Sequence, residues 1–253
     1  FGLLKKKYKN KSFLNLGVSG YSPSIIYKKL KFFYEDGYNF SEIFIFLDTS
    51  DIFDEIYRYK TENNGQISIN LTNKQINSLL EGKKKIINTI YDIFPATFFL
   101  ISFMIDLLPK WSFIENYYLD LMIDHPYGKW SYGQSGLYSE KSINTSLKKN
   151  SYYIDKIIEI TDKNETKATF VLYPWPGHIY QENINNRYNR HWTIFFNNKK
   201  IKLLNLNIQF FEFLKKNNSK DIIFKYYIPG DVHFNENGHK FIFDNINDLI
   251  SVD

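Results

Sequence analysis

The chain has 253 residues, a formal net charge of +5 and no cysteine. A chain of this length can fold as one domain with a full hydrophobic core, and no stretch rich in Pro or Gly marks a linker. The absence of cysteine excludes disulfides, thiolate metal sites and a cysteine nucleophile. The lysines are scattered, except for a group at residues 5–11, and no predicted helix has a continuous basic stripe. The charge therefore does not predict a nucleic-acid partner.

The order of the predicted elements indicates an α/β fold. Apolar runs with the length and composition of buried strands occur at residues 13–18, 42–48, 167–173 and 201–206. Helical patterns lie beside them at residues 24–35, 74–92, 97–108, 151–161 and 209–215. Because strands and helices alternate, we expect a parallel sheet with helices on both faces.

Three other segments complete this single domain of residues 1–253. Residues 108–149 have weak periodicity, which predicts an insertion near the functional site rather than a second domain. The apolar run at residues 98–105 is much shorter than the ~20 residues of a membrane-spanning helix. Near the C-terminus, an apolar series has the spacing of one buried helical face: Ile242, Ile246, Leu249 and Ile250.

Polar clusters follow the first three predicted strands, and a further one precedes the last predicted helix. Ligands of parallel sheets bind at the carboxyl ends of the strands, so we expect these clusters to converge on one pocket. The clusters contain Ser19 and Gly20, then Thr49, Ser50 and Asp51, then Trp175 and His178, and finally Asp231 and His233.

The segment GDVHFNENGH, residues 230–239, contains the strongest catalytic pattern. Asp231 can accept the Nδ1–H of His233 and leave Nε2 free to act as a base, as an orienting acid does in hydrolases. Asn235 suits a helix N-cap, so local structure accounts for it without a catalytic role. Two alternatives for the pair are a structural role at the helix start and a metal site that includes His239.

Two earlier blocks resemble those of the SGNH (GDSL-type) hydrolases, a superfamily of esterases and acyl-transfer enzymes with a flavodoxin-like three-layer α/β fold. NLGVSGYSP, residues 15–23, is similar to the second block of the family, which implies that the N–H of Gly20 donates to the oxyanion. DTSD, residues 48–51, occupies the place of the third block. There the resemblance puts Ser50 at the position of the oxyanion-hole asparagine, and Asp51 supports the loop.

The resemblance extends to the fifth block and implies roles for the C-terminal pair. Residues 230–238 resemble that block, so that His233 would be the base and Asp231 the acid. The first block, Gly-Asp-Ser, which supplies the nucleophile, has no counterpart in residues 1–253. We therefore expect the chain to be a fragment whose first strand and catalytic serine precede Phe1.

The function implied is a serine esterase or O-acyltransferase that acts on acyl esters, acetyl esters among them, of small molecules or of carbohydrate or cell-envelope polymers. Neither a cofactor nor a resident metal is expected. The resemblance favours the cell envelope or the extracellular space, with association with a membrane through the absent N-terminal part. The alternative is a non-catalytic carbohydrate-binding or assembly protein on the same fold, because serine replaces the oxyanion asparagine.

Other residues offer weaker candidates. Trp175 and His178 are expected to line the substrate pocket, and His178 is also an alternative base. Ser19 is an alternative nucleophile, but GVSGY has its second glycine too early for a nucleophile elbow. The carboxylates within residues 48–55 could hold Mg²⁺ or Ca²⁺. We expect the two remaining histidines, His125 and His191, to be solvated loop residues.

Overall fold

The computed structural model describes residues 2–62, 66–72, 75, 112–133, 137–199 and 201–250. Its central sheet contains three parallel strands in the order β1-β4-β5. These strands are β1 (Glu42–Leu47), β4 (Lys167–Leu172) and β5 (Leu203–Asn205). Leu172 is level with Leu47 on one side and with Asn205 on the other, so all three strands end at the same edge. The predicted α/β class with a parallel sheet is confirmed.

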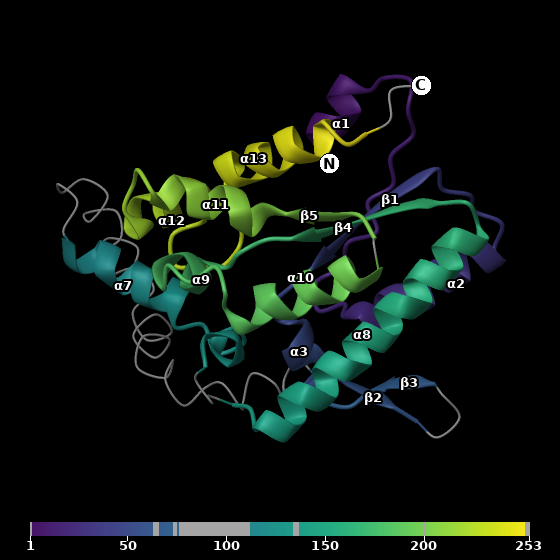
Figure 1. Cartoon of the computed structure of the whole chain (residues 1–253), viewed down its shortest axis with the longest axis horizontal. Coiled ribbons are helices and arrows are strands. Elements are labelled where there is room, and N and C mark those ends of the chain that lie inside the picture. The colour runs from purple at the N-terminus through teal and green to yellow at the C-terminus, as the bar shows by residue number, and fades with distance from the viewer. Residues whose placement is uncertain are drawn as a thin grey trace, which may run out of the picture.

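Helices lie on both sides of this sheet (Figure 1). On one side are α2 (Pro23–Glu35), α8 (Glu140–Lys163) and α10 (Arg187–Lys199), and on the other are α11 (Leu206–Leu214) and α13 (Glu236–Asn247). The middle strand is covered on both faces, because Phe170, Val171 and Leu172 are all fully buried. This burial explains why β4 reads as a continuous apolar run rather than as an alternating pattern.

Smaller elements complete the described structure. A short helix, α3 (Asp51–Phe53), continues as a π-helical turn, η1 (Asp54–Arg58), which leads into a hairpin of β2 (Tyr59–Thr61) and β3 (Ile67–Ile69). The others are α1 (Gly2–Lys7), α7 (Ser112–Ile123), the 3₁₀ turn η2 (Lys129–Tyr132), α9 (Pro176–Tyr180) and α12 (Ser219–Tyr226). Within these described residues, no helix is both long enough and apolar enough to cross a membrane.

The prediction of a buried strand at residues 13–18 is wrong. These residues belong to no described strand, and the side chains of Leu14 and Val18 are 55% and 47% exposed. An apolar run becomes a strand only where its backbone N–H and C=O groups can pair, and no described strand lies against this segment.

Other helix and strand boundaries differ from the predicted ones because of local hydrogen bonds. Strand β5 stops at Asn205 because the side chain of Asn205 accepts the N–H of Asn207 and caps α11. Helix α8 starts at Glu140 rather than at residue 151, after a capping box formed by Ser139 and Ser142. The predicted helices at residues 74–92 and 97–108 lie outside the described residues, apart from residue 75.

The segment predicted as an insertion, residues 108–149, contains α7, η2 and the first turns of α8. Its described part contributes to the main core, where Trp130, Tyr138 and Ile143 are buried. The indole Nε1 of Trp130 donates to the carbonyl oxygen of Thr49, directly after β1. This segment therefore supports the loop that follows β1.

Candidate active site

The loop between α12 and α13 holds Asp231 and His233 as a hydrogen-bonded pair. The Nδ1 atom of His233 lies 2.7 Å from Oδ1 of Asp231, which also accepts the backbone N–H groups of Val232 and His233. Since the carboxylate accepts from Nδ1–H, the Nε2 atom has the lone pair of a base. The His233 side chain is 74% exposed, so this base is accessible from solvent.

The electrostatics of the pair keep the acid ionised. Burial raises the pKa of the Asp231 carboxyl, but the hydrogen bond from His233 and its charge lower it, as do the backbone N–H groups of Val232 and His233. The net result is a pKa below the usual range of an aspartate. Asp231 therefore remains a carboxylate at neutral pH and can orient the imidazole.

The neighbouring residues anchor this loop to the end of β4. Phe234 is 8% exposed, and its ring lies 5.6 Å from that of Tyr173, the residue that follows β4. The N–H of Ile228 donates to the carbonyl oxygen of His233 at 3.0 Å. Asn235 caps α13 by accepting the N–H of Gly238. His233 is thus held beside the carboxyl end of the sheet.

Asp48 joins the ends of β1 and β4. Its Oδ1 atom accepts both the backbone N–H and the hydroxyl of Ser50, at 2.7 and 2.6 Å. Its Oδ2 atom accepts the hydroxyl of Tyr173 and, at 3.3 Å, the indole N–H of Trp175. The single hydroxyl proton of Ser50 is therefore directed at Asp48.

Asp51 also anchors the loop that follows β1. Its Oδ2 atom accepts the backbone N–H of Asp48 at 3.0 Å, and the residue is 4% exposed. Burial raises the pKa of Asp51 well above its usual range, and the charge of Asp48 raises it further. Because Asp51 has little contact with solvent, its role is to hold the loop through this hydrogen bond to Asp48.

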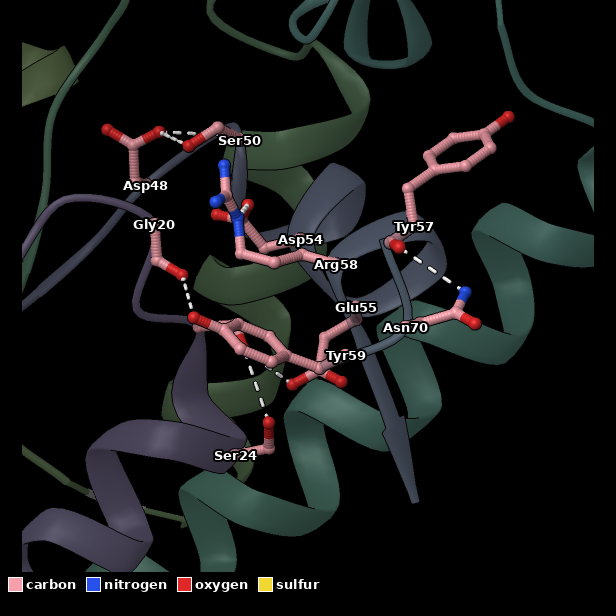
Figure 2. Close-up of polar contacts among 11 residues, drawn as sticks. Gly20, Ser24, Asp48, Ser50, Asp54, Glu55, Tyr57, Arg58, Tyr59 and Asn70 are labelled. Carbon is pink, nitrogen blue, oxygen red and sulfur yellow. Dashed lines mark hydrogen bonds and ion pairs between the residues drawn. The ribbon is translucent and has the colours of Figure 1, made fainter. Parts of the chain in front are cut away.

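Gly20 lies next to the residues of η1, which Figure 2 shows. It has a φ of +77°, in the left-handed region that glycine adopts without strain. The hydroxyl of Tyr59 donates to the carbonyl oxygen of Gly20 at 2.7 Å and fixes the orientation of the following peptide. Figure 2 also draws Arg58 and Asp54, where Nε of Arg58 donates to Oδ1 of Asp54 at 2.7 Å.

Trp175 and His178 are both buried, at 4% and 0% exposure. Nδ1 of His178 accepts the N–H of Trp175 at 3.0 Å, and Nε2 is therefore protonated and donates to the hydroxyl of Ser131 at 2.8 Å. Burial lowers the pKa of His178 to about 3, so the ring is neutral at neutral pH. With both nitrogens engaged, His178 is not available as the alternative base that the sequence suggested.

His178 nevertheless forms part of the wall of a polar cavity of about 480 Å³. Trp175 is not among the residues that line it. The lining is rich in amide and charged side chains: Glu140, Gln181, Asn183, Asn185, Asn186, Arg187 and Arg190. Such a lining suits the hydroxyl groups of a sugar, which both donate and accept hydrogen bonds.

Other sequence candidates have different surroundings from those expected. His191 is not a solvated loop residue, because it lies on α10, bonds to Ser151 at 3.1 Å and has its pKa lowered by burial to about 4. His125 packs edge-on against Trp175. Throughout the described ranges, no group of three or more His, Asp and Glu side chains has the arrangement of a metal site.

The structure connects most of the predicted site, but not all of it. Contacts run from Ser50 through Asp48 to Tyr173, and from Tyr173 through Phe234 to the loop of His233. Gly20 is joined instead to Tyr59 and Arg58, which sequence analysis missed. The spacing of Asp54 and Arg58, four residues apart, was the available signal for an ion pair on one helical face.

Comparisons of this chain with protein-family models, with curated proteins and with solved structures find no match.

Proposed function

We propose that this protein is an SGNH-type serine esterase or O-acyltransferase with a flavodoxin-like fold. The observation that carries the proposal is the 2.7 Å bond between Asp231 and His233, whose exposed imidazole lies on a loop that packs against the end of β4 through Phe234. An acid that holds one imidazole nitrogen while the other faces the reacting group is the arrangement of a hydrolase acid–base pair.

The proposed reaction is acyl transfer through a covalent intermediate. His233 takes the proton of the attacking hydroxyl, and the hydroxyl oxygen bonds to the carbonyl carbon of the ester. Asp231 stabilises the imidazolium that forms, and the N–H of Gly20 binds the oxyanion. Water or a second alcohol then releases the acyl group as an acid or as a new ester. The substrates are acyl esters, acetyl esters among them, of small molecules or polysaccharides.

The sheet order supports the proposed fold. In a flavodoxin-like sheet of order 2-1-3-4-5, the last three strands are adjacent and parallel. The order β1-β4-β5 has the same arrangement of three adjacent parallel strands. The loops after β1 and β4 and the loop of His233 lie at the carboxyl edge, where ligands of such sheets bind.

A second candidate function is a non-catalytic carbohydrate-binding protein. Two observations favour it: the hydroxyl of Ser50 is bonded to Asp48, and the polar cavity beside His178 is lined by amides and arginines. In this case the protein binds saccharides but releases no acid from acyl esters.

Ester hydrolysis by the protein tests the proposal. We expect hydrolysis of p-nitrophenyl acetate, with kcat reduced on the order of 10³-fold or more in His233→Ala. Asp231→Asn should also lower kcat severely, because the amide favours the wrong tautomer of His233. The matched control is His239→Ala, an exposed histidine on α13, which should retain the rate. Full activity of His233→Ala, or activity that depends on a divalent metal, would contradict the acid–base role.

A further inference from the structure

The polar cavity beside His178 is lined by residues of η2, the start of α8, α9, and the segment that leads into α10. Its volume of about 480 Å³ lies within the range of small-molecule sites. The hydroxyl of Ser131 donates to the carbonyl oxygen of Gly128 at 2.5 Å and accepts from Nε2 of His178 at 2.8 Å. The His178 ring also stacks on the buried ring of Tyr188. This wall of the cavity is therefore fixed by the fold.

Some of the polar side chains in the lining are bonded to other parts of the protein. Both terminal nitrogens of Arg187 have acceptors, Nη1 in Glu140 at 2.9 Å and Nη2 in Asn144 at 2.8 Å. Oδ1 of Asn186 accepts the N–H of Asn189, in the first turn of α10, at 3.0 Å. These bonds join the start of α8 to the start of α10. Their members shape the cavity and are not its free binding groups.

One cation and three amide groups of the lining have no partner among the described residues. The cation is the exposed Arg190, whose guanidinium forms neither an ion pair nor a hydrogen bond there. The amide groups are the side-chain amides of Gln181 and Asn185 and the Nδ2 group of Asn183. Since Arg187 neutralises Glu140, the charge of Arg190 is uncompensated within the described lining. The positive end of the α10 dipole lies at the same place.

These free groups match a ligand that has both a carboxylate and hydroxyl groups. A guanidinium binds a carboxylate through two parallel N–H donors. A side-chain amide both donates and accepts hydrogen bonds, as a sugar hydroxyl does. The amide oxygens of Gln181 and Asn185 are acceptors that a small carboxylate such as acetate cannot use, whereas hydroxyl groups can donate to them.

We propose that this cavity binds an acidic saccharide, with the carboxylate of a uronic acid on Arg190 and its hydroxyl groups on the free amides. This inference rests on the second candidate function, whose class of saccharide it names. It requires no residue of the Asp231–His233 pair, because neither residue lines the cavity. It therefore holds whether or not the protein also hydrolyses esters.

The test is a ligand-observed NMR titration of the protein with D-glucuronate, D-glucose and acetate, which measures the dissociation constant of each. D-glucose has the hydroxyl groups without the carboxylate, and acetate has the carboxylate without the hydroxyl groups. We expect D-glucuronate to bind on the order of 10-fold more tightly than either. Arg190→Gln should remove this advantage over D-glucose. Asn185→Ala should weaken both sugars by roughly 2- to 10-fold, because it removes a hydrogen bond to a hydroxyl group.

Two controls separate the outcomes. Lys199→Gln removes a cation at the far end of α10, where Lys199 pairs with Asp155, and should leave the affinity for D-glucuronate unchanged. His233→Ala should also keep this affinity.

Three results would overturn the inference. Equal affinities of D-glucuronate and either D-glucose or acetate would refute the class of ligand. Unchanged binding by Arg190→Gln with a native circular dichroism spectrum, or lost binding by His233→Ala, would refute the cavity as the site. Absence of binding by all three ligands would overturn this inference together with the second candidate function, and it would leave the proposed ester hydrolysis to its own assay.

Discussion

At the scale of single residues, Asp48 has a bonding pattern that only a carboxylate satisfies. One oxygen accepts two donors of Ser50, and the other accepts the side chains of Tyr173 and Trp175. A carboxylate has about four acceptor sites and no donor, whereas an amide of the same shape presents an N–H₂ group. Because these bonds connect the ends of β1 and β4, Asp48 sets the geometry of the strand-end loops.

Asp48→Asn should lower the free energy of unfolding by ~1–3 kcal/mol, since the amide nitrogen would face donors instead of accepting from them. Urea denaturation at neutral pH measures this loss. Asp120→Asn, at an exposed position of α7, is the matched control and should change stability by less than about 0.5 kcal/mol. Equal stabilities of the two variants would show that Asp48 does not hold the loops together.

At the scale of the element, the start of α13 depends on the absence of a side chain at Gly238. Gly238 is buried, and a Cβ there would overlap the carbonyl oxygen of Tyr226 and lie 2.5 Å from Cδ1 of Phe234. The helix can therefore approach α12 closely only with glycine at this position. Phe234 is next to His233, so this packing also determines where the proposed base lies.

Gly238→Ala should destabilise the protein by ~1–3 kcal/mol through overpacking, although alanine is the better helix former by about 1 kcal/mol. It should also lower ester hydrolysis, because the His233 loop must shift to make room. Thermal unfolding and the esterase rate measure the two effects. His239→Ala, one residue further along the same helix, is the control, and a stabilised Gly238→Ala would refute the close packing.

The elements differ in how far sequence alone predicts them. The strand β4 was predicted correctly because its apolar run is buried on both faces, and α2 because its apolar spacing is regular. The run at residues 13–18 has similar composition but is not a strand, since pairing depends on a neighbour that no local pattern specifies. The short α9 and the π-helical turn η1 depend on tertiary contacts and have no clear periodicity.

At the scale of the whole molecule, the buried ionisable groups make stability depend on pH. Burial lowers the pKa of His178 to about 3 and that of His191 to about 4. Below pH ~6.5 the unfolded chain binds protons that these folded histidines do not, so stability is lost as the pH falls toward those values. The contribution of Asp54 to the pH dependence of stability has the opposite sign. Burial raises its pKa to about 6, so the folded state binds the extra proton.

His178→Asn should therefore reduce the acid sensitivity of the protein. The unsubstituted protein and this variant differ in their free energy of unfolding, and this difference should fall by about 2 kcal/mol between pH 7 and pH 5. The reason is that the unfolded chain binds a proton at this histidine, whereas the folded chain keeps it neutral. Asp54→Asn should show the reverse trend, with the advantage of the parent growing as the pH falls. Urea denaturation of the three proteins at both pH values gives the six free energies of unfolding. Parallel pH curves for parent and His178→Asn would contradict a buried neutral imidazole.

The sequence by itself determined the α/β class, three of the strands and the Asp231–His233 pair, because these depend on local composition and on residues two positions apart. Only the tertiary structure decided that Tyr173 and Trp175 donate to Asp48, that His178 is buried and neutral, and that Arg58 lies beside Gly20. Gly20 and Arg58 are 38 positions apart, and Tyr173 and Trp175 lie 125 and 127 positions from Asp48. The burial of His178 requires several elements to pack around it. No local pattern encodes such distances, since they arise when the chain packs around the sheet.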